Sequence, residues 1–148
     1  ANRQTAMTNF VAALAQTEAA MEILRAQKRG HLVMISSVSA MRGMRKTVTT
    51  YAATKAGVAT LAEGLRNEML GEPDLDIRVS TIYPGYIRSE MNERVKKTPF
   101  IVDTKTGVHA MVEAIEKEKA NALVPAWPWV PLGKAMRHLP LPLVRKIM

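Results

Sequence analysis

The pattern of apolar and polar positions predicts three helices that alternate with three strands. Residues 3–27 contain neither glycine nor proline, and apolar side chains recur there at spacings of three, four and seven residues. These side chains are Phe10, Val11, Leu14, Met21 and Leu24. Such spacing predicts a long amphipathic helix. The basic residues and glycine of "KRG" at 28–30 indicate its end.

Two segments have the form of buried strands. One is the continuous apolar run "HLVMIS" at 31–36, which turn-forming residues bound, and the other is "IRVSTIYPG" at 77–85, which ends in a Pro-Gly turn. Strands of this kind are covered on both faces, as in a parallel sheet. The segment "RSEMNERVKK" at 88–97 reads as a short polar helix or a lid.

The remaining segments complete the alternation. A second helix is expected to run to about Leu70, with Thr49 or Thr50 as its cap. Residues 104–119 form a third amphipathic pattern, and "ALVPA" at 122–126 a short third strand. Alternating helices and strands predict an α/β fold, with a parallel sheet that has helices on both faces.

Composition narrows the class of protein. The chain has 148 residues, of which 47% are hydrophobic, which suits one globular domain. It contains no cysteine, so disulfides, thiolate nucleophiles and thiolate metal sites are excluded, and we expect no metal. The lack of cysteine also fits a reducing compartment. Because we find neither a signal peptide nor a membrane-spanning apolar run, we expect a cytoplasmic protein.

The net charge of +8 raises the question of nucleic acid. However, the basic residues are scattered singly along the predicted helices and loops. No basic run is interleaved with aromatic side chains, and no zinc-finger or RNA-binding signature is present. We therefore expect no nucleic-acid partner.

Candidate chemistry gathers where the predicted strands end. Ligands of open parallel sheets bind outside the carboxyl ends of the strands. The first strand ends in Ser36 and Ser37, and the second in Pro84 and Gly85. The helix after the first strand begins with "TYAATKAGVATL" at 50–61, so its first turns are expected at the same edge.

Tyr51 and Lys55 are four residues apart and therefore share one face of this helix. A free tyrosine has a pKa of roughly 10, too high for easy proton exchange near neutrality. A neighbouring lysine cation favours the phenolate and lowers that pKa. Such a tyrosine can exchange a proton with an oxygen that changes between carbonyl and hydroxyl. The small residues Ala52, Ala53 and Gly57 allow a helix or a ligand to approach closely.

Together these motifs resemble the short-chain dehydrogenase/reductase family. The resemblance rests on "TNF" at 8–10, "MISSVSA" at 34–40, "YAATK" at 51–55 and "IYPGYIRSEM" at 82–91. Each motif is weak alone, but their order and spacing are specific, and the similarity extends to about Pro125. It implies three strands of a doubly wound Rossmann-type sheet.

The resemblance also implies a catalytic tetrad. Tyr51 would be the acid/base, and Lys55 would lower its pKa and bind the ribose hydroxyls of the cofactor. Ser37 would orient the substrate oxygen. Asn9 would hold a local helix distortion and a water that links Lys55 to solvent; the alternative is a mid-helix polar side chain that faces water. The interval from Ser37 to Tyr51 is one residue longer than the family's commonest spacing. The rivals of Ser37 are the two other serines nearby, Ser36 and Ser39.

The same resemblance implies binding of NAD or NADP. Pro84, Gly85 and Ile87 would shape the nicotinamide site, with the Ile87 backbone at the carboxamide. Ser89 keeps a hydroxyl where the family usually has a threonine that touches the cofactor. Tyr51 and Lys55 would also contact the cofactor.

The family's glycine-rich phosphate-binding turn is absent from this sequence, because no pair of its eight glycines makes that fingerprint. We therefore expect residues 1–125 to be the C-terminal catalytic half of a Rossmann-type dehydrogenase domain, followed by a Pro-rich, basic and apolar tail, 126–148. The intact protein would interconvert a carbonyl and an alcohol by hydride transfer. By itself the chain is expected to be inactive.

Several apolar side chains and two helices bear on the substrate and the partners. Met91, Val95, Phe100, Trp127 and Trp129 suggest an apolar pocket wall for a small carbonyl or alcohol substrate, or plain packing. One alternative function is a silent interaction module, because a homo-oligomer is expected through helices 3–27 and 50–70. Another is association of the basic tail with an anionic membrane surface. The contrasting expectation is that the tail packs over the substrate cleft or a subunit surface.

Overall fold

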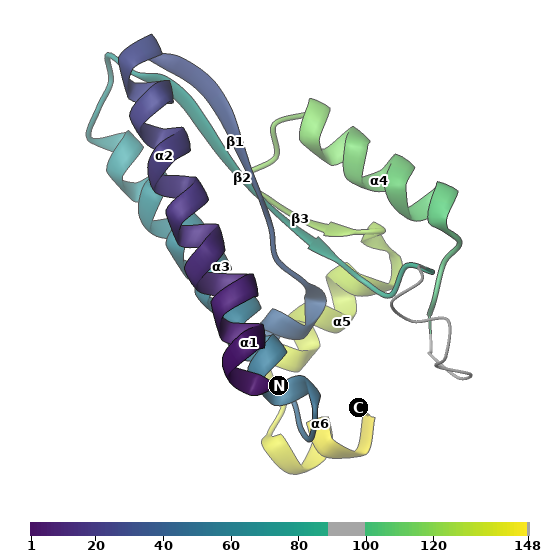
Figure 1. The fold of residues 1–148 in the computed structure, drawn as a ribbon. Helices are drawn as coiled ribbons and strands as arrows, with labels where there is room; N and C mark the ends of the chain where they lie inside the picture. The colour runs from purple at the N-terminus through teal and green to yellow at the C-terminus, as the bar shows by residue number, and fades with distance from the viewer. Residues whose placement is uncertain (89–99, 148) are drawn as a thin grey trace.

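The computed structural model describes residues 1–88 and 100–147 and has an α/β architecture (Figure 1). Its strands are β1 (Arg29–Ile35), β2 (Asp76–Pro84) and β3 (Asn121–Val124). They are parallel and neighbour one another in the order β1-β2-β3. The three predicted strands, their parallel arrangement and the fold class are thus confirmed.

The predicted N-terminal helix is present but is interrupted by a π-helical turn. It consists of α1 (Asn2–Ala6), the π-helical turn Met7–Val11 and α2 (Ala12–Gln27). The expectation that a glycine ends this helix is wrong. Lys28 adopts the left-handed conformation there, with φ of 59°, whereas Gly30 lies inside β1. Gly30 has φ of +151°, and a Cβ on it would lie 2.3 Å from the Leu24 side chain.

The second helix, α3 (Val48–Leu70), begins slightly earlier than expected. Thr47 occupies the cap position without a side-chain hydrogen bond, so the prediction of a Thr49 or Thr50 cap is wrong. Instead, the Thr49 hydroxyl lies in the first turn and is within hydrogen-bonding distance of the Met44 and Lys46 carbonyls. This threonine therefore ties the helix back to the preceding loop.

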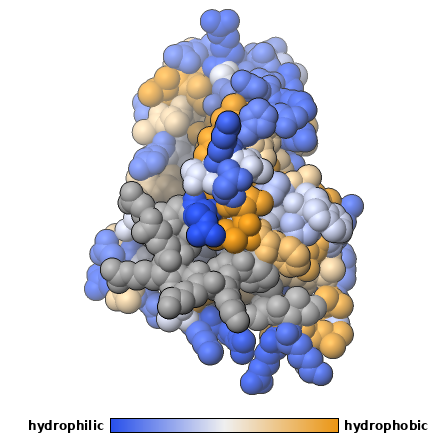
Figure 2. All heavy atoms as spheres, turned by 90° about the vertical axis from the view of Figure 1, so that its right-hand side faces the viewer, coloured by the Kyte–Doolittle hydropathy of each residue, from blue (hydrophilic) through white to orange (hydrophobic). Residues whose placement is uncertain are grey.

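Helices cover both faces of the sheet. In Figure 1, α2 and α3 lie on one side, and α4 (Thr104–Glu116) lies on the other. Asp103 caps α4, because its side chain accepts from the Thr106 amide at 3.0 Å. On the side turned to the viewer in Figure 2, a patch of hydrophobic residues lies near the centre, and further hydrophobic residues lie among hydrophilic ones towards the edges.

The face of α2 and α3 that was predicted to join two copies packs largely within the chain. Met21 and Val58 are buried, at 6% and 3% exposure, in the core that the two helices form with β1 and β2. Phe10, Leu24 and Leu61 pack against the same core. These side chains are therefore covered to a large extent by the chain's own sheet and not by a second copy. A homo-oligomer formed through helices 3–27 and 50–70 stays a prediction.

The C-terminal segment folds into two helices, α5 (Ala126–His138) and α6 (Leu141–Ile147). Leu139 and Pro140 separate them, whereas Pro142 lies within the first turn of α6. Trp129 and Met136, both 1% exposed, form a core cluster with Tyr83 and with Val38 of the loop after β1. Helix α5 therefore packs at the carboxyl end of the sheet. A division of the chain at residue 125 stays a prediction.

None of the helices in the described residues is long and apolar enough to cross a membrane.

Candidate active site

The chain turns sharply after β1 and there presents three serines. Ser37 precedes a 3-10 turn, Val38–Met41, and is almost buried. Its Oγ lies 3.2 Å from the Ser39 amide, which donates to it, and 2.9 Å from Ser39 Oγ. Ser36 points elsewhere, since its hydroxyl donates to the Lys55 carbonyl at 2.8 Å. The three hydroxyls thus have different environments, although they are neighbours in sequence.

The first turns of α3 bring Tyr51 and Lys55 to this turn. Lys55 Nζ lies 5.9 Å from the centroid of the Tyr51 ring. It donates a hydrogen bond to the Ile35 carbonyl, the last residue of β1, at 3.0 Å. Partial burial removes water from this ammonium group and lowers the pKa of Lys55. The predicted pair therefore lies together on one helix face beside the end of β1.

Asn9 is connected to the same helix through a residue that the sequence analysis did not single out. Asn9 lies within the π-helical turn, and its Nδ2 is 3.4 Å from Thr54 Oγ1. The Thr54 hydroxyl in turn donates to the Tyr51 carbonyl at 2.7 Å. The position of Thr54 between Tyr51 and Lys55 is the one sequence feature that could have pointed to a role for it. Its contact with Asn9 is seen only in the folded chain.

Close helix packing supports this arrangement. A Cβ on Gly57 would lie 2.9 Å from the Phe10 ring, so the glycine lets the π-helical turn approach α3. The expectation that small residues near Tyr51 admit another helix is confirmed at this position.

Two of the predicted cofactor-binding residues lie at the end of β2. Pro84 is the last residue of that strand, and the Gly85 amide donates to the Val124 carbonyl at 2.8 Å. A Cβ on Gly85 would lie only 1.9 Å from Nε1 of Trp129. Gly85 is therefore required by the packing of α5, a reason that the sequence did not suggest.

Ile87 lies further along the chain, where it pairs with Val102 in an isolated parallel bridge. Its side chain rests on Gly107 of α4, because a Cβ there would lie 2.6 Å from it. Ser89, Met91 and Val95 fall outside the described residues.

The aromatic residues do not form a single wall. Trp129 is buried and contacts the rings of Tyr86 and Phe100 edge to face, with centroid distances of 5.4 and 6.2 Å. Trp127 is 78% exposed. The burial of Trp129 in a core cluster fits the alternative of plain packing, whereas the exposed Trp127 has the opposite environment.

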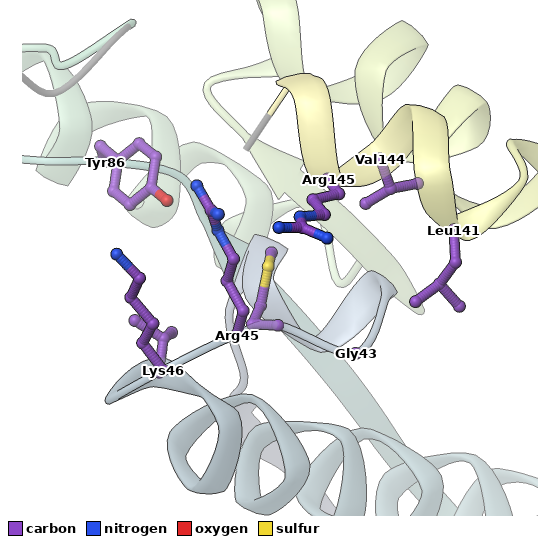
Figure 3. A pocket seen from close by; sticks show the side chains of 9 residues that line it. Gly43, Arg45, Lys46, Tyr86, Leu141, Val144 and Arg145 are labelled. Atoms are coloured by element: carbon purple, nitrogen blue, oxygen red, sulfur yellow. The ribbon is translucent and has the colours of Figure 1, made fainter.

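Two cavities border the region around Tyr51 and Lys55. One, of about 440 Å³, lies between the loop at 43–46, Tyr86 and α6 (Figure 3). The other, of about 450 Å³, lies along β1, and both Lys55 and Asn9 line it. In residues 1–88 and 100–147, no group of three or more His, Asp or Glu side chains is placed to hold a metal ion.

Comparisons with known proteins agree with this geometry. A family model described as short chain dehydrogenase matches residues 2–99. An uncharacterized oxidoreductase of Mycobacterium tuberculosis is 47% identical over 146 residues, which cover 99% of this chain and 56% of the relative. The chain thus spans a little more than half the length of this curated relative.

Solved structures show the same fold. A short chain dehydrogenase from Burkholderia cenocepacia in complex with NADP superposes with a TM-score of 0.81 and 22% identity, over 100% of this chain and 61% of that one. A 4-hydroxyisoleucine dehydrogenase complexed with NADH has a TM-score of 0.65 and 20% identity, over 83% and 57%. With the family model covering most of its length, the chain belongs to the short-chain dehydrogenase family.

Proposed function

We propose that this chain forms the catalytic part of an NAD(P)-dependent oxidoreductase that interconverts a carbonyl and an alcohol. The observation that carries the proposal is the placement of Tyr51 and Lys55 beside the end of β1. Family membership supports it. The activity is proposed for a protein as long as the relatives, called the intact protein below.

Tyr51 is the proposed proton carrier. The nicotinamide, when bound, supplies a hydride to the carbonyl carbon. As the carbonyl's π electrons move onto its oxygen, the Tyr51 hydroxyl donates a proton there, so the product is an alcohol. In the reverse direction the tyrosine takes that proton back. The Lys55 cation beside the ring stabilises the phenolate that remains between the two transfers.

Ser37 is the proposed group that orients the substrate oxygen. Its Oγ lies within hydrogen-bonding distance of the amide and hydroxyl of Ser39. If it accepts from both, its own hydrogen remains available for a carbonyl oxygen. Because the Ser36 hydroxyl already donates its hydrogen to the Lys55 carbonyl, Ser37 is favoured over Ser36 in this role.

The donor set beside β1 fits part of a nicotinamide nucleotide. The Lys55 ammonium has three donors, and the Ile35 carbonyl takes one of them. The others can hold ribose hydroxyls in the cavity that Asn9 also lines. Pro84, Gly85 and Ile87, together with Ser89, remain the proposed nicotinamide contacts, and the cofactor is NAD or NADP.

The test is reduction of simple ketones and aldehydes by the intact protein with NADH and with NADPH, followed by loss of the reduced cofactor's absorbance. We expect turnover with at least one cofactor and a larger loss of kcat in Ser37→Ala than in Ser36→Ala. No turnover with either cofactor across ketones, aldehydes and keto acids would refute the proposal. Inactivity of residues 1–148 alone stays a separate prediction, measured on the purified chain.

A further inference from the structure

The cavity of about 440 Å³ has an unusual set of side chains around it. Its size is within the range of small-molecule sites, roughly 300–1,000 Å³. Residues from three distant parts of the chain line it: the loop before α3, Tyr86 after β2, and α6. Figure 3 shows the side chains of Arg45, Lys46 and Arg145 around one open space, with Tyr86 at its side.

The described residues around this cavity carry charge of one sign. Arg45, Lys46 and Arg145 all line it, and no acidic residue in 1–88 or 100–147 does. None of these three side chains has a hydrogen bond or ion pair with any residue that the structure describes. Three unpaired cations that face the same space favour an anionic ligand group, and guanidinium groups in particular suit carboxylates and phosphates.

Apolar side chains also line this cavity. They are Met44, Val48, Leu141 and Val144, of which Val144 is almost fully buried. An inorganic anion alone would leave this surface uncovered. The lining therefore suits a ligand that combines an anionic group with an apolar body.

The cavity adjoins the proposed proton carrier. Val48 precedes Tyr51 by three residues in α3, so the two share one side of the helix. Tyr86, which also lines the cavity, has a raised pKa. The main cause is its burial, and the second is the nearby Tyr51 phenol. Tyr86 thus links the lining of the cavity to the reaction centre.

We propose that this cavity binds the substrate, and that the substrate is a carbonyl or alcohol with an apolar body and a carboxylate or phosphate group. The substrate part of this inference rests on the proposed function, whereas the binding of an anionic amphiphile does not. A concave site is better matched to a single molecule than to a lipid surface, because its apolar side chains line a hollow.

Binding can be measured on the intact protein without cofactor by titration calorimetry. The probes are octanoate, octyl phosphate and 1-octanol, which have the same chain length, each below its aggregation concentration. We expect at least one of the two anions to bind about tenfold more tightly than the alcohol. Preference between the anions identifies carboxylate or phosphate as the natural group.

Matched variants locate the site. Arg145→Met should weaken binding of the preferred anion about tenfold, and Arg45→Met should weaken it similarly. Lys146→Met is the control, because it removes a cation from the same helix without touching the cavity. Equal losses in Lys146→Met and Arg145→Met, or equal affinity for 1-octanol, would overturn the inference. So would binding to anionic lipid vesicles without binding to the free amphiphiles.

Turnover separates the two proposals. With a ketone that carries the preferred anionic group and with its uncharged ester as substrates, Arg145→Met should lower kcat/KM for the acid only. Anion binding that depends on Arg145 in a protein without any reductase activity would reject the proposed function and leave the ligand site in place. Turnover with equal kcat/KM for acid and ester would reject the substrate class alone.

Discussion

The turn after β1 lies close to the cavity of about 440 Å³, which α6 helps to line. The polar groups of the turn are bonded within the protein, whereas the cations of the cavity are not bonded to any described residue. At the turn, Lys55 is bonded to Ile35, and Ser36 is bonded to the Lys55 backbone. In the cavity, Arg45 and Arg145 have no such partner among the described residues. Proton transfer requires groups held at fixed positions, whereas recognition of a charged ligand requires groups that are still free to bond it.

The two regions also differ in how the chain builds them. The turn draws most of its polar side chains from residues 35–55, and Asn9 joins them from a more distant segment. The cavity needs the loop at 43–46, Tyr86 and α6 to come together. Contacts mostly within residues 35–55 therefore hold the candidate catalytic groups, whereas packing between more distant segments shapes the candidate specificity site.

The largest effect is expected at Tyr51. In the intact protein, Tyr51→Phe should lower kcat by about 100-fold or more, because general acid catalysis contributes at least that much, while cofactor affinity stays close to normal. Steady-state kinetics and cofactor titration measure the two effects. Tyr83→Phe is the control, since its hydroxyl lies on β2 and faces Asn121 at 3.3 Å. If Tyr51→Phe kept more than a tenth of kcat, a loss under about 1.4 kcal/mol, the assignment of the acid would be wrong.

The next effect tests how firmly α5 is packed beside the end of β2. Gly85→Ala places a Cβ 1.9 Å from Nε1 of the buried Trp129, so we expect a loss of about 1–3 kcal/mol in unfolding free energy. Gly64→Ala is the matched control inside α3, where a Cβ meets nothing within 4 Å. It should stabilise the protein by about 0.5–1 kcal/mol. Equal denaturation midpoints for the two variants would contradict this packing.

Arg42 links the two regions and allows a smaller perturbation. Its guanidinium donates to the carbonyls of Arg137 and Leu139, both at 3.2 Å, near the end of α5. Arg42→Met should cost about 1–2 kcal/mol and speed hydrogen exchange in α5 and α6. The control, Arg78→Met, removes an exposed pair with Asp76 and should change stability by less than about 1 kcal/mol. Unchanged exchange in α6 of Arg42→Met would show that the cavity wall is held by other contacts.

The smallest effect concerns the pH dependence of stability. Burial lowers the pKa of Lys55 in the folded state below its ordinary value of 10.5, so the unfolded state binds more protons between the two values. Within that alkaline window, stability should therefore rise with pH at this site. Lys55→Met should remove this contribution and flatten the slope of unfolding free energy against pH. A steeper slope in the variant than in the original protein would contradict the direction of the shift.

The sequence by itself determined the fold class, the positions of the strands to within about two residues and the family. These follow from local periodicity and from motifs whose residues are close in the chain, such as Tyr51 and Lys55. Proximity on one helix turn fixes their mutual placement without reference to the rest of the molecule.

Only the tertiary structure decided how distant segments meet. It buried Trp129 but exposed Trp127, directed Met21 into the sheet, and brought Thr54 to Asn9. An apolar side chain is suited equally to a core and to an interface, so periodicity cannot choose between them. That choice depends on which surfaces are adjacent after folding, and the same holds for the unpaired cations that α6 and the loop at 43–46 bring to one cavity.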